Sequence, residues 1–275
     1  MHKRFARTMG MNVAYTFSKT LDNASDIFLI NNSSPAQSVP SMFGGLSLDK
    51  AVSLYDRPHR LVISYTYELP MFKAQKGAFG RVLGGWSASG IYTYESGIPF
   101  NVANGADADG VGGAVERPDI NPAGRAGVRA QPSATSPTGY INPDVYVPAT
   151  NSYRSEPIDP KDARYIGLPA CTTNFAACRP GTAPRNSERT LPVNNFLLNA
   201  RKNIRMTERY NLTFGGEFYN LFNHPQFGYP SVSIFTPGGG TPAPSTNTSL
   251  AGRFANVRIL DGGGRVVRYN LTLRF

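Results

Sequence analysis

Residues 265–275, RVVRYNLTLRF, alternate between mostly apolar and mostly polar positions up to a final aromatic residue. In an extended strand these two sets fall on opposite faces, and Arg268 and Arg274 share the polar face. The apolar set is Val267, Tyr269, Leu271, Leu273 and Phe275. A soluble sandwich rarely turns two arginines inward, whereas a strand between lipid and a water-filled lumen has this pattern. The segment therefore predicts a membrane-spanning strand of a β-barrel, and many bacterial outer-membrane barrels also end on Phe.

The same alternation recurs earlier in the chain and predicts five more strands. They lie near residues 11–20, 59–69, 85–98, 195–205 and 210–222, and residues 2–5 resemble the end of another strand. The connections between them are alternately short and long, as periplasmic turns and external loops are in antiparallel barrels. The longest, 101–194, is rich in Pro, Gly, Asn and Arg. We therefore predict an all-β, antiparallel up-and-down meander with long extracellular loops.

The alternation also assigns each side chain to lipid or lumen. The side chains expected to face lipid are Leu61, Ile63, Tyr65, Leu212, Phe214, Phe218, Tyr269 and Leu271. Those expected to face inward are Arg60, Glu68, Glu217 and Arg268. A secreted β-sandwich is the alternative. A sandwich explains the alternation equally well. It explains less well why the polar faces of the strands carry charged residues and why short and long connections alternate.

Composition agrees with a barrel and argues against two other classes. The chain has 275 residues, of which 17% are charged, and a formal net charge of +10. Because no run approaches the ~18 apolar residues of a membrane helix, a helical membrane protein is excluded, whereas barrel strands need only ~10 residues. The arginines are spread through loops rather than gathered in a basic stripe with aromatics, which argues against nucleic-acid binding.

The number of strands suggests part of a larger barrel. Six full strands and a stub are fewer than the roughly eight of the smallest bacterial barrels, and open edges in lipid leave costly unpaired backbone groups. The first residues, MHKRFARTMGMNVAYTF, lack the apolar core of a signal peptide. We therefore expect residues 1–275 to form a partial transmembrane β-barrel, the C-terminal portion of a larger one, with plug, signal peptide and earlier strands absent. The alternative is that the start codon of the sequence is misplaced.

Three acidic residues form a weak candidate for a calcium site. When the sequence is aligned on Gly110 with a calcium-binding loop, Asp107, Asp109 and Glu116 occupy the third, fifth and twelfth positions. The first position is Gly105, which has no side-chain ligand. The favoured interpretation is an acidic turn in an exposed loop, and calcium is the alternative.

Cysteine and histidine usage gives no sign of a catalytic centre. Cys171 and Cys178 favour a small disulfide loop in an oxidising compartment over a zinc site, because zinc requires four ligands. Two unpaired thiols are the alternative. The three histidines, His2, His59 and His224, match no catalytic or metal-binding spacing. We therefore expect neither an enzyme nor a cofactor.

Six phrases together resemble one family. In order, they are KRFARTMGMNVAYTFSKTLDNAS, DRPHRLVISYTYELP, GGWSASGIYTYESGIPF, ERPDINPAGR, RYNLTFGGEFYNLFNHPQF and RVVRYNLTLRF. They resemble TonB-dependent outer-membrane receptors of the Oar-like type, which carry a carboxypeptidase-regulatory-like N-terminal domain. The resemblance implies a twenty-two-stranded barrel, a plug domain and energised import. It also implies three partners: outer-membrane lipid, the missing N-terminal barrel and plug, and the TonB complex through the full-length receptor.

These observations lead to one expected function and two alternatives. The expected function is that of a fragment of an outer-membrane receptor that takes up a nutrient of the siderophore, glycan or peptide class. A surface adhesin or binding module would use the same loops without transport. A non-functional remnant of a split receptor gene would have no ligand. The DNA immediately upstream separates these cases, because an in-frame plug and earlier strands favour a misplaced start.

Overall fold

The computed structural model describes residues 2–6, 8–25, 43–112, 116–150, 152–227, 234 and 264–275. The two longest connections, 101–194 and 223–263, are described unequally. Most of the first is described, whereas most of the second lies outside the described residues.

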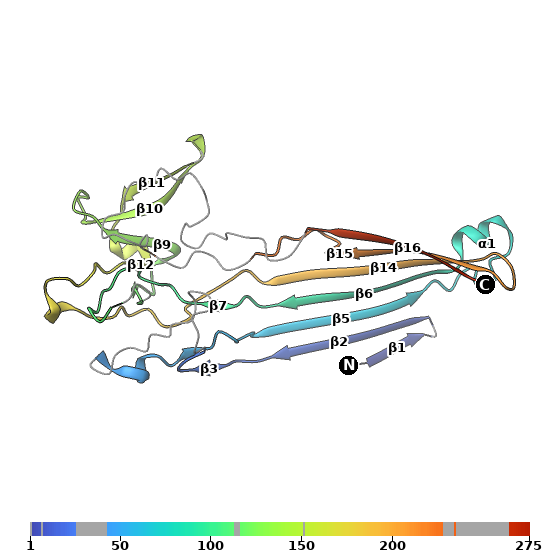
Figure 1. Ribbon diagram of the computed structural model, residues 1–275, viewed down its shortest axis with the longest axis horizontal. Coiled ribbons are helices and arrows are strands. Elements are labelled where there is room, and N and C mark those ends of the chain that lie inside the picture. Colours follow the sequence, from blue (N-terminus) through green and yellow to red (C-terminus); the bar gives the residue numbers. More distant parts are fainter. Residues whose placement is uncertain are drawn as a thin grey trace.

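Seven antiparallel strands form one long sheet in which each strand pairs with its neighbour in sequence (Figure 1). The strands are β1 (His2–Ala6), β2 (Met9–Phe17), β5 (His59–Glu68), β6 (Trp86–Glu95), β14 (Val193–Arg205), β15 (Asn211–Tyr219) and β16 (Val266–Arg274). This order confirms the predicted meander, and the observed strand ends lie within about three residues of the expected ones. The long connections leave the sheet at one end, here called the loop end, and the shorter ones at the other, the turn end.

The register of the sheet places the predicted apolar residues on one face. Ile63 lies opposite Val13 on one side and Tyr92 on the other, and Phe214 lies opposite Leu271. Because directly opposite residues share a face, this apolar face continues across the sheet from β2 to β16. Exposed aromatic residues lie at both of its ends, with Tyr15 and Phe17 at the loop end and Trp86 and Phe275 at the turn end.

The charged residues predicted to face inward share the opposite, polar face. Arg60 lies opposite Glu95 and forms an ion pair with it at 2.8 Å. Glu217 lies opposite Arg268 across the next pair of strands. Ile91 is an exception on this face, because it is apolar and 42% exposed.

Lys202 lies on the apolar face, opposite Trp86, and is almost fully buried. Its Nζ donates to the backbone oxygens of Val82, at 2.8 Å, and of Gly84. It also lies 5.2 Å from the centre of the Trp86 ring. The ammonium group is therefore engaged by carbonyls at the turn end of the sheet.

The Val82 and Gly84 carbonyls end a helix that the sequence did not predict. Residues 70–84 were expected to be a plain connection, but Gly77–Leu83 forms α1. Phe79 and Val82 of this helix are 80% and 66% exposed. No helix within the described ranges has the length and apolar character that crossing a membrane requires.

A second correction concerns residues 101–194, which were expected to be irregular. They contain a five-stranded sheet, the loop sheet, in the order β11-β10-β9-β12-β8 (Figure 1). Its strands are β8 (Asp119–Ile120), β9 (Arg125–Pro132), β10 (Tyr140–Val147), β11 (Ser152–Pro157) and β12 (Ala163–Ile166). Val102, Tyr165 and Ala183 of this connection form a small buried core with Ile234, which comes from the connection between β15 and β16, so residues 101–194 contribute to a packed unit.

Two pairs of short strands lie beyond the main sheet, one in the connection between β2 and β5 and one between the main sheet and the loop sheet. They are β3 (Leu21–Asp22) with β4 (Ala51–Val52), and β7 (Pro99–Phe100) with β13 (Glu188–Arg189). Four 3-10 turns complete the described elements: η2 (Gly45–Leu48), η3 (Pro148–Thr150), η4 (Pro160–Asp162) and η5 (Phe175–Ala177).

Candidate functional site

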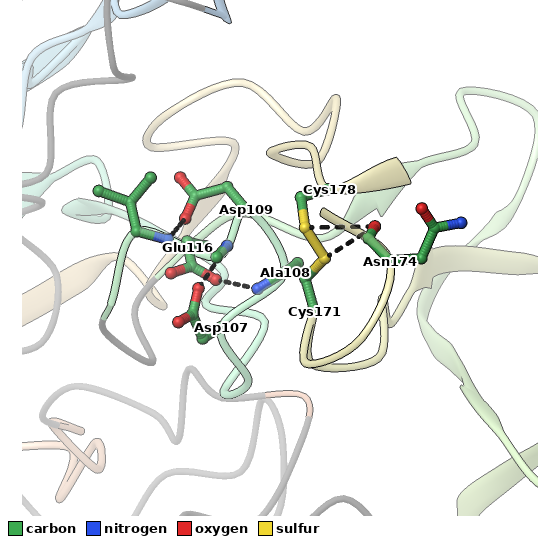
Figure 2. The surroundings of a disulfide bond; sticks show 9 residues. Asp107, Ala108, Asp109, Glu116, Cys171, Asn174 and Cys178 are labelled. Carbon is green, nitrogen blue, oxygen red and sulfur yellow. Dashed lines mark hydrogen bonds between the residues drawn. A yellow bond between two sulfur atoms is a disulfide. The ribbon is translucent and has the colours of Figure 1, made fainter. Parts of the chain in front are cut away.

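The structure brings together the three acidic residues that the sequence singled out. The ligand oxygens of Asp107, Asp109 and Glu116 all lie within 4.8 Å of one another. Figure 2 shows the three carboxylates converging beside the loop that holds Cys171 and Cys178. The acidic residues come from the segment that follows β7, so the stem formed by β7 and β13 leads directly to them.

Backbone amides fix one oxygen of each carboxylate. Gly110 N donates to Asp107 Oδ1 at 2.7 Å, and Val111 N donates to Asp109 Oδ1 at 3.0 Å. Ala108 N donates to Glu116 Oε2 at 2.6 Å. Gly110 adopts φ +74°, a conformation in which glycine is favoured. This turn therefore holds the carboxylates in place through local hydrogen bonds.

Glu116 is only 7% exposed. Its other oxygen, Oε1, is buried and has no hydrogen-bond partner among the described residues. Burial raises the pKa of Glu116 to about 7, the Ala108 amide opposes that rise, and the charges of Asp109 and Asp107 add to it. The cluster therefore concentrates negative charge where water is largely excluded.

Cys171 and Cys178 are joined by a disulfide whose loop lies against the acidic turn. Cys171 N donates to Asp107 O at 2.7 Å, and Arg179 N donates to Ala108 O at 3.1 Å. A side-chain carbon added at Gly110 would lie 3.3 Å from Cys178 Sγ. The acidic turn and the disulfide loop thus form one compact structure, although they are about sixty residues apart in sequence.

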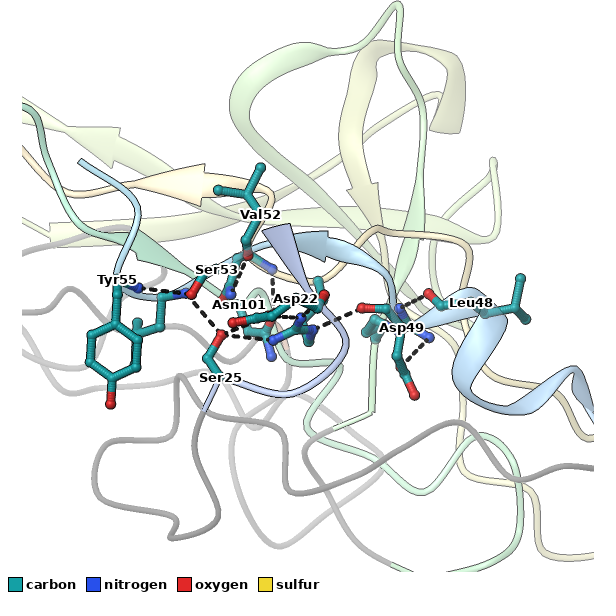
Figure 3. A network of polar contacts seen from close by, with 12 residues as sticks. Asp22, Ser25, Leu48, Asp49, Val52, Ser53, Tyr55 and Asn101 are labelled. Atoms are coloured by element: carbon teal, nitrogen blue, oxygen red, sulfur yellow. Dashed lines mark hydrogen bonds and ion pairs between the residues drawn. The ribbon is translucent and has the colours of Figure 1, made fainter. Parts of the chain in front are cut away.

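A second cluster of polar contacts, shown in Figure 3, was not predicted from the sequence. The side chain of Arg185 is 1% exposed and forms an ion pair with Asp22. It also donates to Asp49 O at 3.1 Å and to Ser25 Oγ at 2.9 Å. Burial opposes the charge of Asp22, but hydrogen bonds from Ser53 and Arg185 hold its pKa below the ordinary value. This network, here called the Arg185 network, ties the β3–β4 connection to the loop that returns to β14.

The polar face of the main sheet contains a hollow of ≈ 390 Å³. Its polar lining includes Ser64, Thr66, Ser89, Asn199 and Glu217, each from this face by register. Asn199 Nδ2 donates to Glu217 Oε1 at 3.3 Å. The lining offers hydrogen-bonding groups to water or to a polar solute.

Two of the three histidines, His59 and His224, are engaged in local contacts, and the side chain of His2 lies outside the described residues. His59 lies in β5, where its Nδ1 is 2.9 Å from Tyr15 Oη. His224 follows β15, and its backbone N donates to Asn220 Oδ1 at 2.9 Å. The expectation that the chain is not an enzyme stays a prediction.

Comparison with known proteins gives one match. The model of a family described as "Outer membrane beta barrel domain" matches residues 1–260. No curated protein matches the chain, and no solved structure does.

Proposed function

Because the chain belongs to the outer membrane beta barrel domain family and lies in the outer membrane, we propose that it is part of a TonB-dependent receptor that imports a nutrient. The observation that carries the proposal is the division of the main sheet into two faces. One face is apolar from β2 to β16, whereas the other carries charged residues and a hollow lined by both polar and apolar residues. Such a sheet fits between lipid and a solute pathway.

The edges of the sheet support a larger assembly. Within the described residues, β1 and β16 each pair on one side only. Unpaired backbone groups in the hydrocarbon region cost several kcal/mol each, so barrels close without edges. Further strands of the same barrel would supply the missing partners, and a plug would occupy the lumen beside the polar face.

The loop end provides the surface that a receptor uses to capture its ligand. The loop sheet, the disulfide loop and the Arg185 network give the described parts of the connections at this end a fixed structure. Preorganised loops bind a ligand at a lower entropic cost than flexible ones do. The imported nutrient would be a siderophore, a glycan or a peptide.

In vivo crosslinking to TonB tests this proposal without knowledge of the ligand. Cells that carry an epitope-tagged version of the protein are treated with formaldehyde, and the outer-membrane fraction is immunoprecipitated and probed for TonB. We expect a TonB adduct with the tagged protein and none with a tagged porin from the same membrane. Equal absence of the adduct from both proteins would contradict energised import.

A surface-binding module is the second candidate, because Tyr165 of the loop sheet packs with Val102, Ala183 and Ile234 in a small buried core at the loop end. Labelled ferric siderophores, maltooligosaccharides and oligopeptides separate the two functions. A receptor gives uptake that requires the protein and stops when a protonophore is added. An adhesin retains a probe at the cell surface, insensitive to the protonophore.

A further inference from the structure

We propose that Asp107, Asp109 and Glu116 bind one calcium ion at the loop end of the molecule. The site is independent of the proposed import function, because its ligands lie in the loops rather than on the sheet. Three observations support it: the spacing of the oxygens, the unsatisfied oxygen of Glu116, and the lack of a neutralising basic side chain among the residues that the structure describes.

The spacing of the oxygens fits a single calcium ion. Calcium takes oxygen ligands at about 2.3–2.6 Å, so two oxygens on one ion lie at most about 5 Å apart. The ligand atoms of the three carboxylates are all within 4.8 Å of one another. Zinc prefers nitrogen and sulfur ligands, and this cluster offers only oxygen.

Glu116 supplies the observation that points to a ligand. Its side chain is buried, and Oε1 has no partner among the described residues, whereas Oε2 already accepts from Ala108 N. A buried carboxylate oxygen without a hydrogen bond or a counter-charge is costly, so native structures pair such atoms with a donor or a metal ion. A cation placed among the three carboxylates meets this requirement.

Among the described residues, no basic side chain provides a counter-charge to the cluster. None of the described basic side chains forms an ion pair with these three residues. Two arginines close to the cluster, Arg117 beside Glu116 in sequence and Arg179 through its backbone contact with Ala108, are engaged elsewhere. Arg117 pairs with Asp49, and Arg179 pairs with Asp119. A divalent cation would therefore neutralise most of the local charge.

Calcium suits this irregular loop better than magnesium does. Magnesium demands near-ideal octahedral geometry and keeps most of its water, whereas calcium accepts six to eight oxygens in flexible arrangements. The backbone carbonyls of Asp107 and Ala108 already accept hydrogen bonds from the backbone amides of Cys171 and Arg179. A bound ion would therefore hold the acidic turn in the conformation against which Cys171 and Arg179 pack.

Equilibrium binding of radioactive calcium tests the site directly. The protein is extracted from outer membranes in detergent, stripped with EGTA and dialysed against labelled calcium. We expect one site, with a Kd of about 10⁻⁴–10⁻³ M, as in extracellular modules. Tenfold excess magnesium should displace little of it.

Two substitutions and one matched control localise the site. Glu116→Gln keeps an acceptor for Ala108 N but removes the charge, and Asp109→Asn does the same for Val111 N. Each should weaken binding at least tenfold. Asp159→Asn alters an exposed carboxylate of the same unit that pairs with Lys161, and it should bind as the unsubstituted protein does.

Protease protection provides a second readout that does not depend on the amount of bound calcium. Heat-modifiable migration on a gel first establishes that each variant has assembled. Calcium should then slow cleavage within residues 101–112 in the unsubstituted protein and in Asp159→Asn, but not in Glu116→Gln. No calcium binding by the assembled, unsubstituted protein, or equal binding by all variants, would overturn the proposal.

Discussion

Tyr65 and Gly90 lie opposite each other across the β5–β6 pair, and the tyrosine ring fills the space that a side chain at position 90 would occupy. A carbon added at Gly90 would lie 2.7 Å from Tyr65 Oη and 2.6 Å from Leu197 O. Glycine within a strand often marks such a close approach. The ring therefore covers backbone that glycine leaves open on the apolar face.

This relationship predicts that Gly90→Val impairs assembly. Overpacking typically costs about 1–3 kcal/mol, and here the backbone oxygen of Leu197 cannot move away without disturbing β14. Ala88→Val is the matched control, because it enlarges a residue of the same face and strand that already carries a side-chain carbon. The yield of heat-modifiable protein in outer-membrane fractions measures the effect. Equal yields for both variants would show that the contact has no importance.

The two faces of β16 should tolerate charge very differently. A charged side chain at the midplane on the lipid face costs about 2–4 kcal/mol, whereas the lumen face is wet. Leu271→Arg should therefore strongly reduce insertion, and Asn270→Arg, one residue away, should not. Equal recovery of both variants from the outer membrane would contradict the assignment of faces.

Loss of the Arg185 side chain should disorder the loop end without dissolving the main sheet. Removing one member of a buried ion pair leaves the other charge uncompensated and costs about 3–5 kcal/mol. We expect Arg185→Met to speed proteolysis of the β3–β4 connection while assembly is retained. Arg154→Met removes an exposed partner of Glu156, and it should change the cleavage rate little.

The contact between the disulfide loop and β8 should weaken in acid. Burial opposes the charge of Asp119, but hydrogen bonds from Arg179 and Thr182 hold its pKa below the ordinary value. Because the folded pKa is depressed, this stabilisation is full above the unfolded value of about 3.9 and is lost as pH falls through the folded one. The rate of amide hydrogen exchange in residues 171–182, corrected for the intrinsic rate, should therefore rise as pH falls below about 3.9. Asp119→Asn should show no such pH dependence.

The strands were predictable because lipid and lumen impose a period of two on the sequence. In β15, Leu212 and Phe214 alternate with Thr213 and Gly215, and the structure separates them accordingly. The ends of the strands were harder to predict, because pairing continues beyond the alternating segment wherever two neighbouring strands remain close. Val193 pairs with Glu95, for example, two residues before the predicted start of β14.

The unpredicted parts depend on contacts between distant residues. Helix α1 contains two glycines in seven residues and forms no side-chain cap at Lys76. Its end is held instead by Lys202, from a strand more than a hundred residues later. The loop sheet pairs β8 with β12 across forty residues of Pro- and Gly-rich sequence. Local periodicity carries no signal for either.

The acidic cluster could be selected from the sequence because its members lie within ten residues of one another. The spacing could not show that Glu116 is buried, since that burial depends on tertiary packing. Arg185 had no recognisable motif, and its partners Asp22 and Asp49 lie more than 130 residues away. Such networks become visible only when the loops are placed in space.

We expect the apolar face of the main sheet to contact lipid and the polar face to line an aqueous lumen. Spin labels on single cysteines at Leu212, Thr213 and Phe214 test it in outer membranes, and the native cysteines do not compete because they form a disulfide. Positions 212 and 214 should be accessible to oxygen and shielded from a water-soluble nickel complex, and position 213 should show the reverse. Equal accessibility of all three positions to both reagents would contradict the account.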